Sequence, residues 1–456
     1  HDDPTNNNHS CKSLSKKNLL SFVLLLALMP VSAQVELYVA QNGNDKNPGS
    51  SSKPFKTVNR AVEAAASRKD KAVTIHLREG IYYLEKTIAI NAATFQPASL
   101  QIAAYNNEKV TISAGKRLQL QWKPWKDGIY MARVPAGISF ERMYINDALQ
   151  PLARYPNYDS TARVFHGTAA DAIAPERVKK WKNPTGGYVH ALHAYEWGGF
   201  HYRITGADDK GNLKLEGGWQ NNRPNKMHEK YRFVENIFEE LDAPGEWWLD
   251  REKNILYYYP SKGIDITKAI VVVAQLKNSI ELKGKEEKPL KNIRISGLRF
   301  AHNERSFMDT KEPLLRSDWT IYRGGVILMD GTERCKINDC VFEGIGGNAI
   351  MVSNYNKYDT ISGCHIYNTG ANAVCFVGDT KSVRSPSFGY ENFVPYDQLD
   401  KTPGPLTNNY PQNCIVTDNL FHDLGDIEKQ ATGVQIQVAS EITVRYNSIY
   451  QTSRAG

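Results

Sequence analysis

Two stretches of the chain, Ile337-Asn338-Asp339-Cys340-Val341-Phe342 and Ile361-Ser362-Gly363-Cys364-His365-Ile366, share one pattern of apolar and polar residues. The pattern recurs from Ile295, Val416 and Val444, and a second apolar strand alternates with it at 325–328, 348–351, 372–375 and 432–435. A unit of about 24 residues, the interval between the two stretches, cannot bury its own apolar side and must stack on its neighbours. The sequence therefore predicts an all-β fold built as a parallel β-helix.

The residues expected inside the coil form like-on-like stacks. Cys340 lies one repeat from Cys364, and Asn419 lies one repeat from Asn447. A buried Asn must hydrogen-bond to neighbouring backbone and side chains to be tolerated. We expect the cysteines of the coil to be buried thiols, because no Cys pair or His partner has the spacing of a metal site.

The rest of the chain divides into three parts. Residues 34–119 are expected to form the first coils and a cap, in which Phe55 to Ala65 has the apolar spacing of a helix. Residues 120–268 lack the repeat and read as an inserted antiparallel β-sandwich-like domain. Residues 269–456 are expected to form the main coils, and with nothing to cap the last one we expect the coil to continue beyond Gly456. The turn Asn42 to Asp45 offers oxygens for Ca²⁺, although no acidic ligand follows at a fixed spacing.

Residues 1–33 have the features of a secretory signal peptide. Basic residues precede an apolar run from Leu19 to Met29, and Val31-Ser32-Ala33 provides small residues for cleavage before Gln34. The apolar run is about half of the ~20 residues that a membrane-spanning helix requires. We therefore expect a secreted or periplasmic protein without a membrane span.

The net charge is small for the length of the chain. It is +7, from 56 basic and 49 acidic residues, and no stretch has the dense Lys and Arg of a nucleic-acid-binding arm. We expect a monomer that binds no nucleic acid, and the weak positive charge alone does not identify a partner.

Several motifs resemble those of secreted right-handed β-helix carbohydrate-active proteins of the pectate-lyase-like superfamily. They are Tyr38-Val39-Ala40 with Asn42-Gly43-Asn44-Asp45, Lys53-Pro54-Phe55-Lys56-Thr57, Pro244-Gly245-Glu246-Trp247-Trp248 and Leu256-Tyr257-Tyr258-Tyr259-Pro260. Among characterised groups the chain resembles glycoside hydrolase family 141, which has α-L-fucosidase and xylanase activities, and its architecture resembles the family 120 β-xylosidases. The resemblance implies a polysaccharide or oligosaccharide substrate. It assigns no catalytic residues, which we expect in coils beyond Gly456 if not among those below.

The expected site is a groove along the strands that contain Met351, Cys375 and Gln435, between insertions at 301–322 and 380–412. Glycoside hydrolysis needs two carboxyl groups on opposite sides of the scissile bond. We predict Asp426 and Glu428 as this pair. Asp423, Asp379 and Glu343 are further candidates, and for each carboxylate the alternative is a solvated loop charge.

Aromatic residues on the insertions are expected to stack on sugar rings, or else to pack their loops onto the coil. The predicted substrate-binding residues are Trp319, Tyr322, Arg323, Asp379, Tyr390, Gln435 and Gln437. His365 and His422 are read as surface turn residues or, alternatively, as acid/base groups.

No metal ligands or cofactor are assigned. The expected function is glycoside hydrolysis, with two alternatives. A polysaccharide lyase would need clustered carboxylates for Ca²⁺ and a Lys or Arg base, whereas a non-catalytic glycan-binding protein would need only the aromatic walls.

Overall fold

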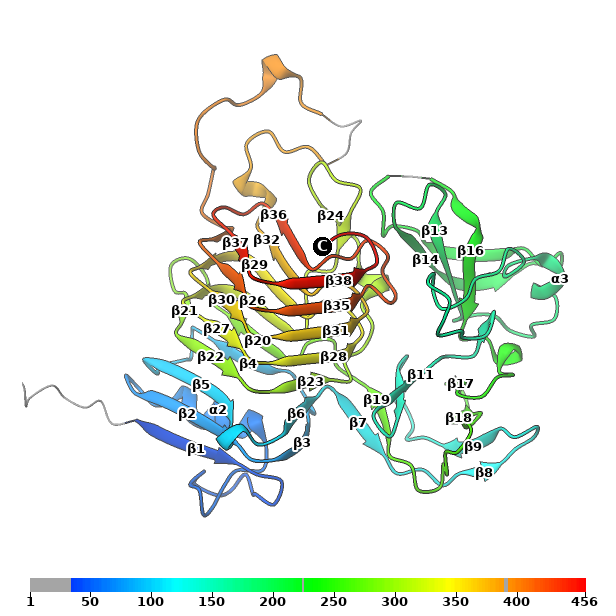
Figure 1. Cartoon of the computed structure of the whole chain (residues 1–456), viewed down its shortest axis with the longest axis horizontal. Helices are drawn as coiled ribbons and strands as arrows, with labels where there is room; N and C mark the ends of the chain where they lie inside the picture. Colours follow the sequence, from blue (N-terminus) through cyan, green and yellow to red (C-terminus); the bar gives the residue numbers. More distant parts are fainter. Residues whose placement is uncertain (1–33, 224, 389–392) are drawn as a thin grey trace, which may run out of the picture.

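The structure is a computed structural model that describes residues 34–223, 225–388 and 393–456. Three parallel sheets wind into one coil, which stands beside a set of antiparallel sheets (Figure 1). The prediction of an all-β parallel β-helix is confirmed. The predicted signal peptide lies outside the described residues.

The coil has three sheets, called I, II and III below. From β4 (Ile88–Asn91) onward each turn contributes one strand to each sheet, in the chain order III, I, II. Sheet I contains β1 (Val35–Val39), β2 (Ala72–Leu77), β5 (Ser99–Ala104), β22 (Ile293–Ser296), β27 (Lys336–Asn338), β30 (Thr360–Ser362), β34 (Ile415–Thr417) and β37 (Thr443–Arg445). Sheet II contains β3 (Gly80–Tyr83), β6 (Val110–Ser113), β23 (Arg299–Ala301), β28 (Val341–Ile345), β31 (His365–Thr369), β35 (Leu420–Leu424) and β38 (Ser448–Thr452). Sheet III contains β4 (Ile88–Asn91), β20 (Ile280–Lys283), β26 (Ile327–Glu333), β29 (Ile350–Lys357), β32 (Val374–Val377) and β36 (Val434–Gln437), with β21 (Leu290–Lys291) and β33 (Pro411–Gln412) at its side.

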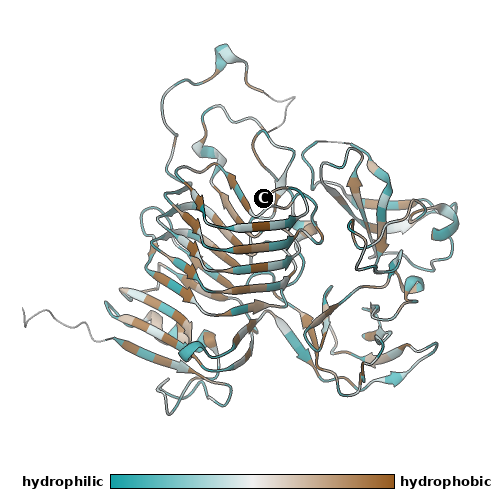
Figure 2. Cartoon of the chain, viewed as in Figure 1, coloured by the Kyte–Doolittle hydropathy of each residue, from teal (hydrophilic) through white to brown (hydrophobic). Residues whose placement is uncertain are grey.

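The core of the coil is built from residues at equivalent positions of successive turns. Phe300 pairs in register with Phe342, and their rings stack with centroids 5.0 Å apart. Cys340 and Cys364 are buried free thiols, as expected. Figure 2 shows apolar residues recurring along the stacked strands of the coil. Each short strand therefore buries its apolar side only because the next coil covers it.

Buried asparagines satisfy the polar groups where the chain turns between sheets. Asn419 Nδ2 donates to Asn447 Oδ1 at 2.8 Å and also to the Ile361 carbonyl, as predicted for this stack. A second row that the repeat did not reveal runs through Asn348 and Asn372, whose Nδ2 donates to Asn348 Oδ1 at 2.8 Å. These rows replace the water that the buried backbone would otherwise need.

Helix α2 (Val58–Ala66) packs on β1, β2 and β4 with a buried face of Val58, Ala61, Val62 and Ala65. Asp45 Oδ1 accepts hydrogen bonds from the backbone of Lys56 and Thr57, so the oxygens of this turn tie down the approach to the helix. Among the residues that the structure describes, no group of three His, Cys, Asp or Glu is placed to hold a metal ion. Within the same residues, no helix is long and apolar enough to cross a membrane.

The insertion consists of two antiparallel parts. One is a sandwich of two four-stranded sheets around Phe140, Trp247 and Tyr258, formed by β7 (Gly115–Leu118), β8 (Lys123–Pro124), β9 (Tyr130–Arg133), β10 (Met143–Ile145), β11 (Ala148–Gln150), β17 (Trp247–Asp250), β18 (Ile255–Tyr258) and β19 (Val271–Ala274). The other, called the side lobe below, is a five-stranded sheet of β12 (Arg154–Tyr155), β13 (Tyr188–His193), β14 (Gly199–Ala207), β15 (Leu213–Gly217) and β16 (Met227–Glu235), with the short helix α3 (Pro175–Val178).

The expectation that the repeat resumes at residue 269 is wrong. Strand β19 pairs antiparallel with β7 and β10 inside the sandwich, and the coil resumes only at β20. The run of valines at 271–273 is apolar because the sandwich buries it, and this burial cannot be distinguished from that of a coil strand by periodicity alone.

Asp359 is a buried carboxyl group inside the coil. Its Oδ1 accepts from the Cys335 backbone at 2.7 Å, and its Oδ2 lies 2.6 Å from Thr332 Oγ1. The Thr332 hydroxyl also lies 2.7 Å from Asn356 Oδ1, and it has only one proton to donate. Both contacts are satisfied when Asp359 is protonated and donates to Thr332. Burial likewise raises the pKa of Asp359 to about 7.

We predict that the native chain loses stability as the pH rises because Asp359 ionises, and that Asp359→Asn does not show this loss. A carboxyl group whose pKa rises on folding favours the folded state only while protonated, so its contribution declines as the pH rises from 3.8 to about 7. The Asn amide can donate to Thr332 at any pH. The melting temperature of the variant minus that of the native chain should therefore be larger at pH 8 than at pH 5. An equal difference at both pH values, as expected for the exposed control Asp418→Asn, would contradict this assignment.

Candidate functional site

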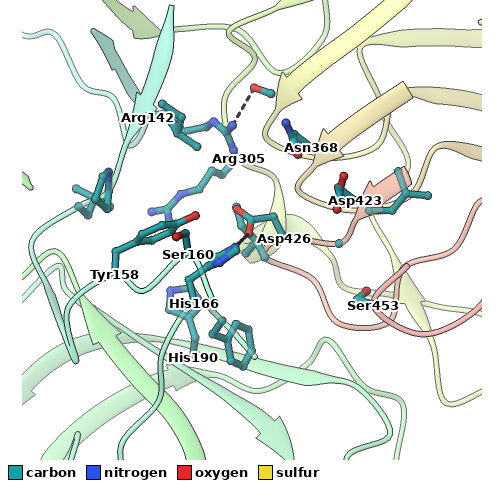
Figure 3. A pocket seen from close by; sticks show the side chains of 18 of the residues that line it. Arg142, Tyr158, Ser160, His166, His190, Arg305, Asn368, Asp423, Asp426 and Ser453 are labelled. Atoms are coloured by element: carbon teal, nitrogen blue, oxygen red, sulfur yellow. Dashed lines mark hydrogen bonds and ion pairs between the residues drawn. The ribbon is translucent and has the colours of Figure 1, made fainter. Parts of the chain in front are cut away.

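A cavity of about 1360 Å³ lies between the coil and the insertion. Its coil wall is formed by the ends of β23, β28, β31, β35 and β38 in sheet II and by the turn 425–433 that leads to sheet III. The opposite wall comes from the loop 158–166, from strands β13 and β16 of the side lobe, and from residues near β10 and β11 (Figure 3). The site is thus assembled from segments far apart in the sequence.

One column of the coil directs its side chains into this cavity. Gly344, Asn368, Asp423 and Gln451 occupy the same place in successive strands of sheet II, and each has a positive φ, between 49° and 59°. Gly, Asn and Asp tolerate this left-handed conformation better than other residues. The left-handed residue interrupts the strand alternation, and Asn368 and Asp423 lie in the cavity wall.

Asp426 lies in the coil wall and is hydrogen-bonded by a residue of the opposite wall. His166 Nε2, from the insertion, donates to its Oδ1 at 2.8 Å. Burial alone would raise the pKa of Asp426, but the hydrogen bond from His166 and the charge of Lys429 outweigh burial and lower the pKa to about 2. Asp426 is therefore ionised at any physiological pH.

Lys429 is hydrogen-bonded to the backbone of the same turn. Its Nζ donates to the carbonyls of Gly425 and Asp426 at 2.7 and 2.8 Å and lies 4.9 Å from the centre of the Phe165 ring. Burial lowers the pKa of Lys429 to about 8, against the opposing effect of Asp426. The ammonium group therefore holds the turn in place while it adds positive charge beside the carboxylate.

A row of two histidines leads to Asp423. His422 Nδ1 lies 2.6 Å from Asp423 Oδ2, and His422 Nε2 lies 2.8 Å from His365 Nε2. With Asp423 as a carboxylate, whose oxygens accept, His422 donates to Asp423 and accepts from His365. The rings of Tyr367 and Tyr450 stack on either side of His422 and fix its orientation.

Arg305, buried at the end of sheet II, joins the coil to the insertion. Its guanidinium contacts Glu235 and lies 3.0 Å from Glu141 Oε2, and His190 Nε2 lies 3.0 Å from Glu235 Oε1. Burial would raise the pKa of Glu235, but Arg305 and His190 outweigh burial and hold it well below its usual range. These charges are paired with one another and form the floor of the cavity.

Tyr158 provides an exposed aromatic ring at the cavity wall. It is 47% exposed and stacks on His166, with ring centroids 4.6 Å apart. Behind it the Arg154 guanidinium lies 4.0 Å from the centre of the Phe233 ring and donates to the carbonyls of Pro156 and Gly167. The cavity thus combines an aromatic face with several carboxylates, as sugar-binding sites require.

The structure brings some of the predicted site residues together and separates others. Asp426, Asp423 and Glu343 line the cavity, and Arg299 Nε donates to Glu343 at 2.8 Å. Glu428 points from the same turn to the other side, against Ser306 and Thr310, where burial raises its pKa to about 7. Asp426 and Glu428 therefore do not face one space, because the irregular turn directs Asp426 into the cavity and Glu428 toward Ser306 and Thr310.

The predicted groove along sheet III is filled by the segment 301–322, which was expected to form one of its walls. Met351, Cys375 and Val377 pack against Leu314 and Ile321 in an apolar cluster, with Trp319 and Leu328 at its edge. Trp319 therefore packs its loop onto the coil, which was the alternative reading of the aromatic walls. This face of the coil is core rather than an open groove.

The remaining predicted substrate-binding residues have structural partners outside the cavity. Arg323 donates to Glu312 Oε2 at 2.8 Å and to the Val377 carbonyl at 2.7 Å, Asp379 accepts from Asn409 Nδ2, and Gln437 donates to the Leu315 carbonyl. Tyr322 is partly buried beside Gly324, and Gln435 pairs with Cys375 across sheet III. Tyr390 lies outside the described residues. The structure does not bring the described residues of this set to Asp426.

The insertion's share of the site was missed by sequence reasoning. Five of the eleven histidines lie between residues 166 and 228, a concentration that could have drawn attention to this part of the chain. His166 and His190 are two of them, and both line the cavity. No periodic pattern places them opposite Asp426, because the contact spans 260 residues.

Comparison with known families agrees with the coil. The family model described as "Right handed beta helix region" matches residues 324–456, and the one described as "Protein of unknown function (DUF1565)" matches residues 41–88. The chain is also similar to the "Uncharacterized protein YwoF" of Bacillus subtilis (strain 168), with 36% identity over 77 residues. This match spans 17% of the chain and only 15% of the relative.

Two solved structures resemble the described fold as a whole. One described as "Glycoside hydrolase" has a TM-score of 0.73 at 17% identity and matches over 92% of this chain and 78% of that one. Another, described as the complex of XylC with xylose, has a TM-score of 0.51 at 14% identity, over 92% of this chain and 59% of that one. At such identities the similarity concerns the fold.

We predict that Arg305→Met destabilises the protein by about 3–5 kcal/mol, because the change leaves the buried Glu235 without its cation. Urea unfolding measures the difference, with Arg133→Met at an exposed position of β9 as the control. If both variants unfold at the same urea concentration, Arg305 does not hold the insertion against the coil.

Proposed function

We propose that this chain is a glycoside hydrolase whose reacting sugar binds in the cavity between the coil and the insertion. The observation that carries the proposal is Asp426, a carboxylate kept ionised by His166 and Lys429 in a cavity large enough for a sugar. Such a group acts as the nucleophile or as the base that activates water. The fold shared with carbohydrate-active proteins is consistent with this role.

Asp423 is the proposed second carboxyl group. It is exposed in the cavity wall three residues before Asp426, in the column of left-handed residues of sheet II. As the acid, Asp423 in its protonated form gives its proton to the leaving oxygen, and the carboxylate so formed accepts the hydrogen bond from His422 Nδ1. The attacking water later yields the balancing proton to the pair of carboxylates. Tyr158 stacks on the sugar ring and Asn368 binds its hydroxyl groups.

The substrates to test first follow from the resemblance of the sequence. They are the 4-nitrophenyl glycosides of α-L-fucose and β-D-xylose, followed by plant and host glycans. We propose further that the chain acts outside the cytoplasm, in the medium or the periplasm, because residues 1–33 have the features of a signal peptide.

A lyase is a second proposal, favoured by Lys429. Burial lowers its pKa to about 8, within reach of a proton-abstracting base. In that case uronate-containing polymers would yield an unsaturated product that absorbs ultraviolet light, with no release of reducing sugar from neutral glycans. Retention of both hydrogen bonds to carbonyls argues against this role.

We predict that Asp426→Asn and Asp423→Asn each lower kcat/KM on the best glycoside at least a hundredfold, as the loss of an acid/base group does. Initial rates measure the effect, with Asp418→Asn as the matched control on another turn of the same coil. Near-normal rates in both variants would refute this assignment of the pair. If the native chain releases no sugar from any substrate, the hydrolase proposal fails.

A further inference from the structure

The hairpin tip between β13 and β14 exposes two aromatic rings. Tyr195 is 64% exposed and Trp197 is 39% exposed, and their ring centroids lie 5.3 Å apart. An exposed aromatic pair costs free energy in water unless something covers it in use. The residue between them, Glu196, lines the cavity described above, so the rings stand beside its mouth.

The tip is held in one conformation by short-range contacts. The His193 backbone donates to the Gly198 carbonyl at 2.8 Å, and the Glu196 backbone donates to the His193 carbonyl at 2.7 Å. The His193 ring stacks on Trp197 with centroids 5.4 Å apart, and the Arg223 guanidinium lies 4.9 Å from the centre of the Trp197 ring. Trp197 is thus a support, and Tyr195 is the outer ring with free surface.

The hairpin also packs against the turn that carries Asp426. A Cβ atom added at Gly198 would lie 2.2 Å from Cγ of Gln430, so a side chain at this position has no room. Gln430 follows Lys429 in the turn 425–433 and donates to the Asp318 carbonyl at 2.9 Å. The position of the rings relative to Asp426 is therefore fixed by close contact.

We propose that Tyr195, supported by Trp197, forms an outer subsite that binds a second sugar unit of a neutral oligosaccharide or polysaccharide. The apolar face of a pyranose stacks on such a ring, and the Glu196 carboxylate accepts hydrogen bonds from sugar hydroxyls. This inference rests on the proposed function and adds that the substrate extends beyond the cavity.

Two of the cations that line the cavity are engaged by carboxylates, and Arg142, Arg154 and Lys429 donate to carbonyl oxygens, which favours a neutral glycan over an acidic one. Arg305 is paired with Glu235 and Glu141, and Arg299 is paired with Asp147 and Glu343. An anionic sugar would have to compete with these carboxylates, whereas a neutral sugar needs only hydroxyl contacts and an aromatic face.

The test compares long and short substrates in the full chain. For Tyr195→Ala and Trp197→Ala, the ratio of kcat/KM on a neutral hexasaccharide to that on the matching 4-nitrophenyl monoglycoside should fall at least tenfold. Tyr195→Phe, which keeps the ring, should retain the native ratio. Tyr358→Ala is the matched control, since Tyr358 is 50% exposed under Arg334 at a turn of the coil. An unchanged ratio in both alanine variants overturns the inference and leaves the hydrolase proposal standing.

A binding measurement separates the two proposals. Calorimetry with xylohexaose, cellohexaose and mannohexaose is done on Asp426→Asn, with and without Tyr195→Ala. A tenfold weaker affinity in the double variant supports the outer subsite even if the native chain cleaves nothing. Equal affinities, no binding of any hexasaccharide, or a dimer that Tyr195→Ala dissociates would each overturn it, the last because a second copy would then be what covers the rings.

Discussion

In-register hydrogen bonding between successive coils is the constraint on which the rest of the structure depends. A strand such as β30, Thr360–Ser362, is too short to bury its apolar side or to satisfy its backbone alone. Pairing with β27 and β34 supplies both, provided that each residue lies over its counterpart in the next coil. Side chains therefore form columns, and a change of residue type along a column changes one level of the coil without disturbing the others.

The same register explains where chemistry is possible on this fold. Three corners join the sheets, and length can be added at a corner without breaking a ladder. At the corner between sheets II and III, the turns 346–349 and 370–373 are short and lined by buried Asn, whereas the next turn, 425–433, is longer and carries Asp426 and Lys429. The column of left-handed residues beside it places Asn368 and Asp423 at the same cavity.

Opposite charges join the insertion to the coil. Arg305 belongs to the coil and is buried between two carboxylates of the insertion, while Asp426 of the coil is held by His166 of the insertion. Arg305 lies among buried carboxylates, where such contacts are strong, whereas His166 and Asp426 keep 32% and 36% of their side-chain surface exposed. Both contacts hold the two parts together on either side of the cavity. The electrostatic character of the proposed site and the placement of the insertion therefore have one cause.

The sequence by itself determined the coil, because stacked repeats place the same residue types at the same offsets: Cys340 over Cys364 and Asn419 beside Asn447 are visible as a pattern. It also singled out Asp426, which lines the cavity, since that residue belongs to a turn of the repeat. The tertiary structure decided which way each side chain faces and what it meets. Glu428 turns away from the cavity, the supposed groove is filled by Leu314 and Ile321, and His166 reaches Asp426 across 260 residues. Periodicity reports burial along a strand, whereas contacts between an irregular insertion and the coil depend on packing that no local spacing encodes.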